Sequence, residues 1–222
     1  MLVKHWMNQP AVAIASGRNL KSALALMKQH EIHMLSVVSD NRLIGMVFED
    51  DFNFRFDNSS GSAPFHPKEN NAPVDAVMRR DFPKVTTENT VEETAELMLA
   101  YKMCKVPVID RDGYLVGTLS REDVLNVLIN LTGARRQGIL FIVRLKNRLK
   151  SIQDVTDLVR SYGGRMISFL APSEDNRSKY RKAYIRMYGI DRFKLLSLNE
   201  KLADVAELIY VKDRPEVGRI LE

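Results

Sequence analysis

Two short segments place an aspartate six residues after a glycine. The first reads GMVFEDD over residues 45–51, and the second reads GTLSRED over residues 117–123. A carboxylate accepts hydrogen bonds at two oxygens, and a hydroxyl such as that of Ser120 both donates and accepts. The second segment could therefore hold a polar ligand, or Asp123 could cap the helix that follows. In the first segment Phe48 stands where the hydroxyl would be.

The two segments belong to an internal repeat. Residues 7–52 align with residues 78–125 at an offset of 71, which rises to 72 after one extra residue in the second turn. Each copy predicts a short strand, a helix with apolar residues at three- and four-residue spacing, two more strands and a closing helix. Thr90 and Glu93 have the spacing of a capping box, which predicts a helix over about 91–101.

The repeated pattern Gly-hydrophobic-hydrophobic-Ser/Thr-x-x-Asp resembles the CBS domain, and two copies resemble a Bateman module. This resemblance implies a pseudo-twofold pair with two clefts between the repeats. It also implies a regulatory protein, not an enzyme, that binds AMP, ATP or another adenosine derivative such as S-adenosylmethionine. A carboxylate would accept hydrogen bonds from the ribose hydroxyls, and a hydroxyl would hold a phosphate oxygen.

The resemblance also implies which residues form the clefts. In the competent cleft, Asp123 would hold the ribose, Ser120 and Lys105 a phosphate, and the base would lie near Ala11, Val12, Ile32 and His33. The second cleft would contain Asp51, Val85 and Met103. It is expected to be impaired, because it lacks the hydroxyl that Phe48 replaces.

Beyond residue 137 the pattern becomes strand, helix, strand, strand, helix, strand. Strands are predicted at 139–145, 166–171, 180–188 and near 205–211, with helices at 151–162 and near 192–200. The order resembles the ACT domain, a ferredoxin-like regulatory fold. Residues 146–150 lack the proline-glycine turn of the amino-acid-binding members. Dimerisation is therefore expected there more than amino-acid binding.

The expected fold class is mixed α and β: two β-α-β-β-α repeats as a pseudo-twofold pair, then a ferredoxin-like βαββαβ domain. The predicted boundaries are 1–56 for the first repeat, 57–72 for a linker, 73–132 for the second repeat, 137–213 for the ACT-like domain and 214–222 for a tail. This combination resembles the AcuB-type acetoin utilisation proteins.

The composition indicates the cellular compartment of the protein and the charge of its partners. No run approaches the roughly 18 apolar residues of a membrane span, and the N-terminus lacks the apolar core of a signal peptide, so a cytoplasmic protein is expected. The single cysteine, Cys104, cannot form an internal disulfide, which fits a reducing compartment. The net charge of +5 favours anionic partners, although an evenly spread excess of Lys and Arg is expected to be solvated surface.

Three other functions have weaker support in the sequence than nucleotide sensing. His30 and His33 lie three apart but have no third ligand, so neither a metal nor a cofactor is expected. The runner-up is an oligomerisation module with vestigial sites. A third reading, a nucleic-acid binder, depends on the alternating cations Arg144, Lys146, Arg148 and Lys150. Nucleic acid is not expected as a partner, because no helix-turn-helix or RNA-binding motif is present. A homodimer is expected, and the regulated protein partner is unknown.

Overall fold

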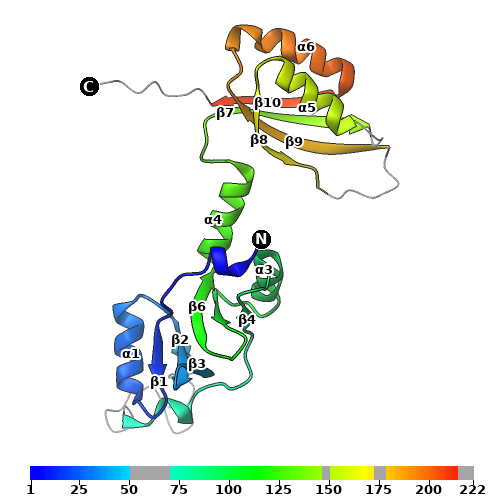
Figure 1. Cartoon of the computed structure of the whole chain (residues 1–222). Helices are drawn as coiled ribbons and strands as arrows, with labels where there is room; N and C mark the ends of the chain where they lie inside the picture. The colour runs from blue at the N-terminus through cyan, green and yellow to red at the C-terminus, as the bar shows by residue number, and fades with distance from the viewer. Residues whose placement is uncertain (51–70, 147–150, 173–178, 215–222) are drawn as a thin grey trace, which may run out of the picture. The chain divides into compact units, whose positions relative to one another are not determined.

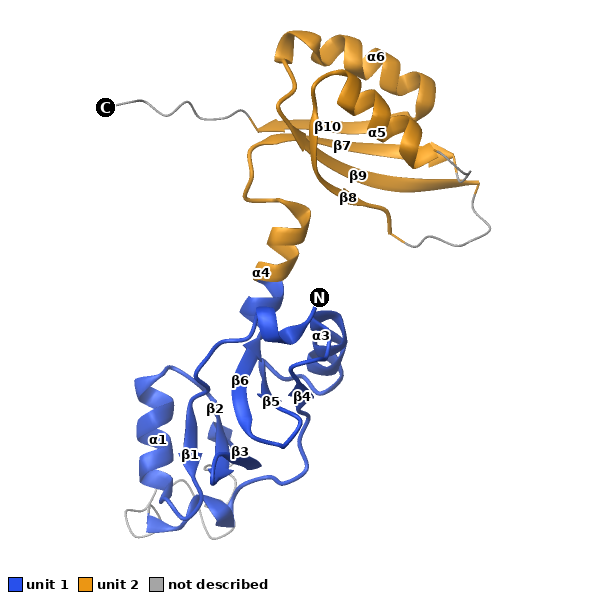
Figure 2. Ribbon diagram, viewed as in Figure 1, with its two compact units in different colours: residues 1–125 blue, residues 126–222 orange. Residues whose placement is uncertain are grey.

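The computed structural model describes residues 1–50, 71–146, 151–172 and 179–214. Two compact units divide the chain, residues 1–125 and residues 126–222 (Figure 2), and the division falls within helix α4 (Arg121–Thr132). Asp51 of the predicted second cleft lies outside the described residues, as do Arg148 and Lys150.

Unit 1 holds two copies of one arrangement, each with a three-stranded sheet and a helix (Figure 1). In each sheet the first strand is parallel to the second, and the second is antiparallel to the third. The first copy contains η1 (Val3–His5), β1 (Ala13–Ala15), α1 (Leu20–Gln29), β2 (Met34–Ser39) and β3 (Arg42–Phe48). The second contains η3 (Val74–Ala76), β4 (Val85–Thr86), α3 (Val91–Ala100), β5 (Lys105–Ile109), β6 (Leu115–Ser120) and α4.

Side-chain caps set where the helices of unit 1 begin. The predicted capping box is confirmed: Thr90 Oγ1 accepts from the Glu93 amide, and the Glu93 carboxylate accepts from the Thr90 amide. In the first copy Asn19 takes the same position and accepts from the Ser22 amide at 2.9 Å. Each cap satisfies a backbone donor that has no partner within the helix.

The segment before each sheet, which we call the arm (residues 1–12 and 71–84), crosses to the other repeat. Asn8 and Thr118 on β6 exchange two backbone hydrogen bonds, at 2.8 and 3.1 Å. At the equivalent positions of the other repeat, Arg79 and Met46 exchange two at 2.8 and 3.0 Å. The arms are thus exchanged reciprocally between the repeats.

Residues of each exchanged arm also enter the other repeat, and the two repeats are related by a pseudo-twofold axis. Val74 and Met78, from the arm of the second repeat, belong to the buried cluster of the first. Arg42 and Tyr114, which occupy equivalent positions, bridge to each other. The predicted pseudo-twofold pair is therefore present, with its axis at this bridge.

Unit 2 is a four-stranded antiparallel sheet with the order β10-β7-β9-β8. Its elements are β7 (Gly138–Lys146), α5 (Ser151–Ser161), β8 (Arg165–Leu170), β9 (Tyr180–Tyr188), η4 (Arg192–Lys194), α6 (Leu195–Val205) and β10 (Glu207–Arg214). Both helices lie on one face of the sheet (Figure 1), over a core centred on Phe141, Ile185 and Leu202. The predicted ferredoxin-like order is confirmed.

The last helix and strand lie further along the chain than predicted. The residues expected to begin the helix form the short turn η4, which Asp191 caps by accepting from the Phe193 amide at 3.0 Å. The helix α6 then continues to Val205, because Leu198 and Leu202 are fully buried on one face and Val205 packs against the same core. Placing Val205 in a strand was wrong.

Candidate ligand site between the repeats

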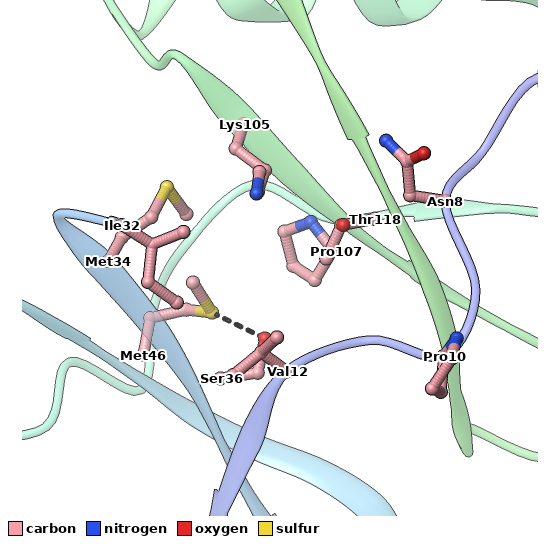
Figure 3. A pocket seen from close by; sticks show the side chains of 10 residues that line it. All are labelled: Asn8, Pro10, Val12, Ile32, Met34, Ser36, Met46, Lys105, Pro107 and Thr118. Carbon is pink, nitrogen blue, oxygen red and sulfur yellow. Dashed lines mark hydrogen bonds between the residues drawn. The ribbon is translucent and has the colours of Figure 1, made fainter. Parts of the chain in front are cut away.

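A cavity opens between the two repeats of unit 1 (Figure 3). Its volume is about 140 Å³. This is below the roughly 300–1,000 Å³ of most small-molecule sites, so a nucleotide would have to extend from the cavity into solvent. The cavity is lined by Asn8, Pro10, Val12, Ile32, Met34, Ser36, Met46, Lys105, Pro107 and Thr118. The lining is mainly apolar with a few polar groups, which is typical of a site for an organic ligand.

The exchanged arm forms one wall of this cavity. The backbone pairing of Asn8 with Thr118 carries the arm across β6, so that Asn8, Pro10 and Val12 face strands of both repeats. On β2, the buried Ser36 donates a hydrogen bond from its hydroxyl to the Met46 sulfur at 3.5 Å (Figure 3). This polar group of the first repeat is therefore satisfied without a ligand.

Lys105 is the one charged side chain among the ten lining residues. It begins β5, and Figure 3 shows its ammonium group directed into the cavity, toward the apolar side chains of the first repeat. Within the described residues it has no carboxylate within ion-pair distance. A cation in an otherwise apolar lining favours an anionic ligand group.

Asp123 and Ser120 lie beside the cavity and are joined to it through Asn8. The Asn8 amide donates to Asp123 Oδ2 at 2.8 Å. The same oxygen accepts from the Ser120 amide at 2.7 Å and from the Ser120 hydroxyl at 2.6 Å. The Asp123 amide in turn donates to Ser120 Oγ at 3.2 Å. Ser120 is therefore the N-cap of α4, and Asp123 completes a capping box with it. Among the described residues the other oxygen of Asp123, Oδ1, accepts no hydrogen bond.

The predicted residues of the competent cleft are only partly gathered around the cavity. Val12, Ile32 and Lys105 line it, whereas Ala11 and His33 do not. The His33 side chain is 87% exposed, and its Nδ1 lies 2.5 Å from the Glu49 carboxylate. Sequence reasoning missed Asn8 and Pro10, which the exchanged arm brings to the site, and Thr118, the residue of β6 with which Asn8 pairs. No local pattern signals that exchange.

The second cleft differs at the positions equivalent to Asn8 and Ser120. These positions hold Arg79 and Phe48, and the Arg79 guanidinium lies over the Phe48 ring at 4.6 Å from its centroid. Val85 and Met103, also predicted for this cleft, are buried, with 6% and 7% of their surfaces exposed. A cation-aromatic stack therefore stands where the competent cleft has the amide of Asn8 and the hydroxyl of Ser120.

The glycine that opens each repeated motif makes room for the other repeat's arm. A Cβ atom on Gly117 would lie 2.9 Å from both the Asn8 carbonyl oxygen and the Met7 sulfur. A Cβ atom on Gly45 would lie 2.5 Å from the sulfur of Met78, the residue equivalent to Met7. The motif glycines are thus explained by close packing of the arms and not by backbone torsion.

The described residues contain neither a cluster of metal ligands nor a membrane-spanning helix. In the described ranges, no three His, Cys, Asp or Glu side chains gather where they could hold a metal ion. Across those same ranges, every helix is too short or too polar to cross a membrane. Cys104 is exposed and unbonded.

Comparisons with known proteins agree with this architecture. The CBS domain family profile matches residues 3–55 and 74–130. A CBS domain-containing protein of Dictyostelium discoideum is 29% identical over 140 residues, which span 59% of this chain and 93% of that protein. An inosine-5′-monophosphate dehydrogenase of Korarchaeum cryptofilum is 28% identical over 113 residues, 51% of this chain but only 21% of the enzyme.

A solved structure has a similar fold. It is AcuB of Vibrio cholerae, a protein named for acetoin utilization, with a TM-score of 0.52 and 24% identity over 61% of this chain and 95% of that one. The internal repeat, the exchanged arms and the profile match all concern unit 1. The chain therefore belongs to the CBS-domain family, with a CBS-domain pair in unit 1.

Proposed function

We propose that this protein is a regulatory sensor that binds an adenosine-containing nucleotide, AMP or ATP, in the cavity between its CBS repeats. The observation that carries the proposal is the position of Lys105. It is the single charged group in the lining, and the Asn8–Asp123 hydrogen bond lies at the edge of the same cavity. CBS-domain pairs are typically regulatory and bind adenosine ligands.

Each part of a nucleotide has a chemically matched group at the site. Asp123 Oδ1 is available to accept from the ribose hydroxyls, and Lys105 offers an ammonium to a phosphate. The Ser120 hydroxyl would hold a phosphate oxygen by turning its proton away from Asp123 Oδ2, to which it donates in this structure. Val12 and Ile32 offer apolar surface to the base, with Ala11 and His33 just outside the lining. One cation suits a monophosphate better than a triphosphate, so AMP should bind at least as well as ATP.

Only one cleft is proposed to bind the ligand. In the second cleft the Arg79 guanidinium lies over Phe48, at the positions equivalent to Asn8 and Ser120. A ligand would have to displace this stack, and it would find no hydroxyl for its phosphate. We therefore expect one nucleotide per chain.

Unit 2 is proposed to serve as an ACT-like domain for dimerisation or signal transmission. Its ferredoxin-like topology supports this role. Helix α4, which joins the units, exposes Leu125, Leu128 and Leu131 at three-residue spacing, by 57%, 54% and 46%. Such an apolar stripe favours pairing with a second copy of the chain, and light scattering of the full chain should give twice the 25.4 kDa of the monomer.

No enzymatic activity is proposed. The match to the dehydrogenase covers a fifth of that enzyme and lies in its CBS region. A pure oligomerisation module with vestigial sites is the competing function, and the two are separated by whether any adenosine ligand binds.

Titration calorimetry of the full chain with adenosine, AMP, ADP, ATP and S-adenosylmethionine tests the proposal. The expected result is saturable binding of AMP at one site per chain. Absence of binding heat for every one of these ligands at millimolar concentration would favour the oligomerisation module. Inosine monophosphate serves as a base-specificity control.

A further inference from the structure

The positive charge of the chain is concentrated in one unit. Residues 1–125 carry 14 Lys and Arg against 17 Asp and Glu, whereas residues 126–222 carry 19 against 11. The excess is therefore not spread evenly, contrary to the expectation from overall composition. All of the net positive charge comes from unit 2.

Much of this charge lies on the sheet face opposite the helices. Side chains alternate between the two faces along each strand. The residues of β7 and β9 that face the helices are buried in the core, among them Phe141, Val143 and Ile185. Their neighbours on the same strands must therefore point to the other surface, which we call the open face (Figure 1).

The strand register gives the layout of the open face. One row across the sheet runs Tyr210, Ile142, Tyr184 and Leu170. The row on one side runs Lys212, Leu140, Arg186 and Ser168, and the row on the other runs Glu207, Arg144 and Lys182. Tyr188 and Arg165 are opposite each other one row beyond Arg186. Tyrosines and cations thus alternate, with Glu207 as the one acidic residue in these rows.

Some of these groups are already engaged. Arg144 forms a bidentate ion pair with Glu207, at 2.7 and 2.8 Å. Arg186 Nε donates to the Thr132 carbonyl at 3.0 Å, and burial together with the charge of Arg214 lowers the pKa of Arg186. Lys146, Lys182 and Lys212 are exposed and make no ion pair within the described residues. Lys182 and Lys212 therefore lie in the rows on either side of the tyrosine row, Lys146 lies one row beyond Lys182, and all three are available to an anion.

The composition of the open face decides what could cover it. A symmetric contact between two copies would place one net positive face against another, and like charges at an interface oppose association. An anionic partner is therefore favoured over a second copy. The half-exposed Tyr210 and the partly exposed Tyr184 add flat aromatic surface between the cations.

We propose that the open face of unit 2 binds single-stranded nucleic acid, with bases stacking on Tyr184 and Tyr210 and phosphates meeting Lys182 and Lys212. Single-strand sites combine a basic surface with aromatic side chains on which unpaired bases stack. An acidic protein surface could also pack against the tyrosines, but a row of tyrosines between rows of cations matches the alternation of bases and phosphates along a single strand. The inference does not depend on nucleotide binding in unit 1.

Fluorescence anisotropy of the full chain with labelled single-stranded RNA or DNA of about 12 nucleotides tests this proposal, since such sites span about 4–16 nucleotides. Tyr184→Ala and Tyr210→Ala should each weaken binding by about tenfold, whereas the Phe variants should stay within about twofold of the natural protein. Lys182→Gln should lessen the salt dependence of affinity by about 0.7 in the log-log slope.

Matched controls come from the helical side of the same unit. Phe193 is 97% exposed in η4, and Lys201 is exposed on α6, so Phe193→Ala and Lys201→Gln remove the same kinds of group without touching the open face. Both should leave affinity unchanged. Because Tyr184 is partly buried, circular dichroism should verify that its variants fold, and Lys182→Gln on the exposed surface provides an independent reading.

Three results would overturn the proposal. The first is no binding by the natural protein at concentrations up to about 100 μM in about 100 mM salt, because even non-specific binding has a Kd of about 10⁻⁴–10⁻⁶ M there. The second is binding that the tyrosine variants leave unchanged, which would mean attachment by charge alone. The third is a change from dimer to monomer in Lys182→Gln without nucleic-acid binding, which would make the face an interface between proteins.

Discussion

Asn8 donates its side-chain amide to Asp123 Oδ2 at 2.8 Å, although 115 residues separate the two in the chain. The bond joins the exchanged arm of the first repeat to the first turn of α4 in the second. A ligand that engages Asp123 would therefore also affect the arm that lines the cavity and pairs with β6. This connection gives the proposed site a route by which occupancy can alter the contact between the repeats.

Asp123→Ala should weaken AMP binding by at least tenfold, because a hydrogen bond to a charged group contributes about 1.5–3 kcal/mol. It should also lower the free energy of unfolding by about 1 kcal/mol, since α4 loses the carboxylate half of its capping box while Ser120 remains as the N-cap. Asn19→Ala is the matched control, because it removes the cap of α1 but lies outside the cavity lining. Calorimetry and urea unfolding separate the two effects. Equal AMP affinity in all three proteins would mean that Asp123 only caps the helix.

Lys105→Met should weaken binding of AMP more than binding of adenosine, because the nucleoside carries no phosphate for the ammonium group. The difference should be about tenfold, the lower end of the range for a charge-assisted hydrogen bond. Lys21→Met, an exposed position on α1, should change neither affinity. If calorimetry gave equal losses for AMP and adenosine, Lys105 would be supporting the cavity structurally.

The polar side chains of the competent cleft can be introduced into the second cleft by substitution. Phe48→Ser combined with Arg79→Asn supplies the hydroxyl and amide of the competent cleft and removes the stack measured at 4.6 Å. We expect a second, weaker AMP site in the double variant, visible as a stoichiometry above one in calorimetry. Phe48→Ser alone is the control, since Arg79 remains. A natural protein that already binds two AMP molecules with equal affinity would contradict the assignment of a single site.

Gly117→Ala should destabilise unit 1 by about 1–3 kcal/mol, the usual cost of overpacking. Its Cβ would press on the Asn8 carbonyl oxygen, which the Thr118 amide holds at 3.1 Å. Gly45→Ala should cost less, because the crowded atoms belong to the flexible Met78 side chain. Thermal melts of the two variants give the comparison, and a larger loss in Gly45→Ala would go against this explanation.

Lowering the pH should remove the stabilisation that the ionised Asp75 carboxylate gives to the folded protein. Hydrogen bonds from the Ser16 hydroxyl and then the Gly17 amide lower the pKa of Asp75 below its ordinary 3.8. The ionised Asp75 therefore adds fully to the free energy of unfolding at pH values above its ordinary pKa. This stabilisation is lost as the pH falls through the lowered pKa of the folded state. Asp75→Asn should reduce stability at neutral pH by less than about 1 kcal/mol, because solvent screens the exposed carboxylate.

Urea unfolding at pH 7 and in strong acid measures that difference. The gap between the natural protein and Asp75→Asn should shrink as the pH falls below the pKa of the folded state. Asp81→Asn, at another exposed position of the same arm, should show a much smaller gap at either pH. A gap for Asp75→Asn that persisted in acid would point to packing instead of charge.

Local patterns in the sequence were enough to predict the repeat, the capping box at Thr90 and Glu93, and the ferredoxin-like order. Each depends on residues close together in the chain or on periodicity within one element. The contribution of Asn8 could not be predicted in this way, because it depends on backbone pairing with Thr118 on the other repeat. The end of α6 at Val205 was missed for a related reason: the core beneath the helix determines its length.

The reciprocal arms also bear on how such a chain could have arisen and how it can be divided. The arm of the first repeat, which contains Val3, packs against the second repeat, and the arm of the second repeat, which contains Val74, packs against the first. Two separate half-length chains could make the same exchange, so unit 1 has the architecture of a domain-swapped dimer fused by duplication. A single repeat expressed by itself would therefore be expected to associate with another copy in order to complete its core.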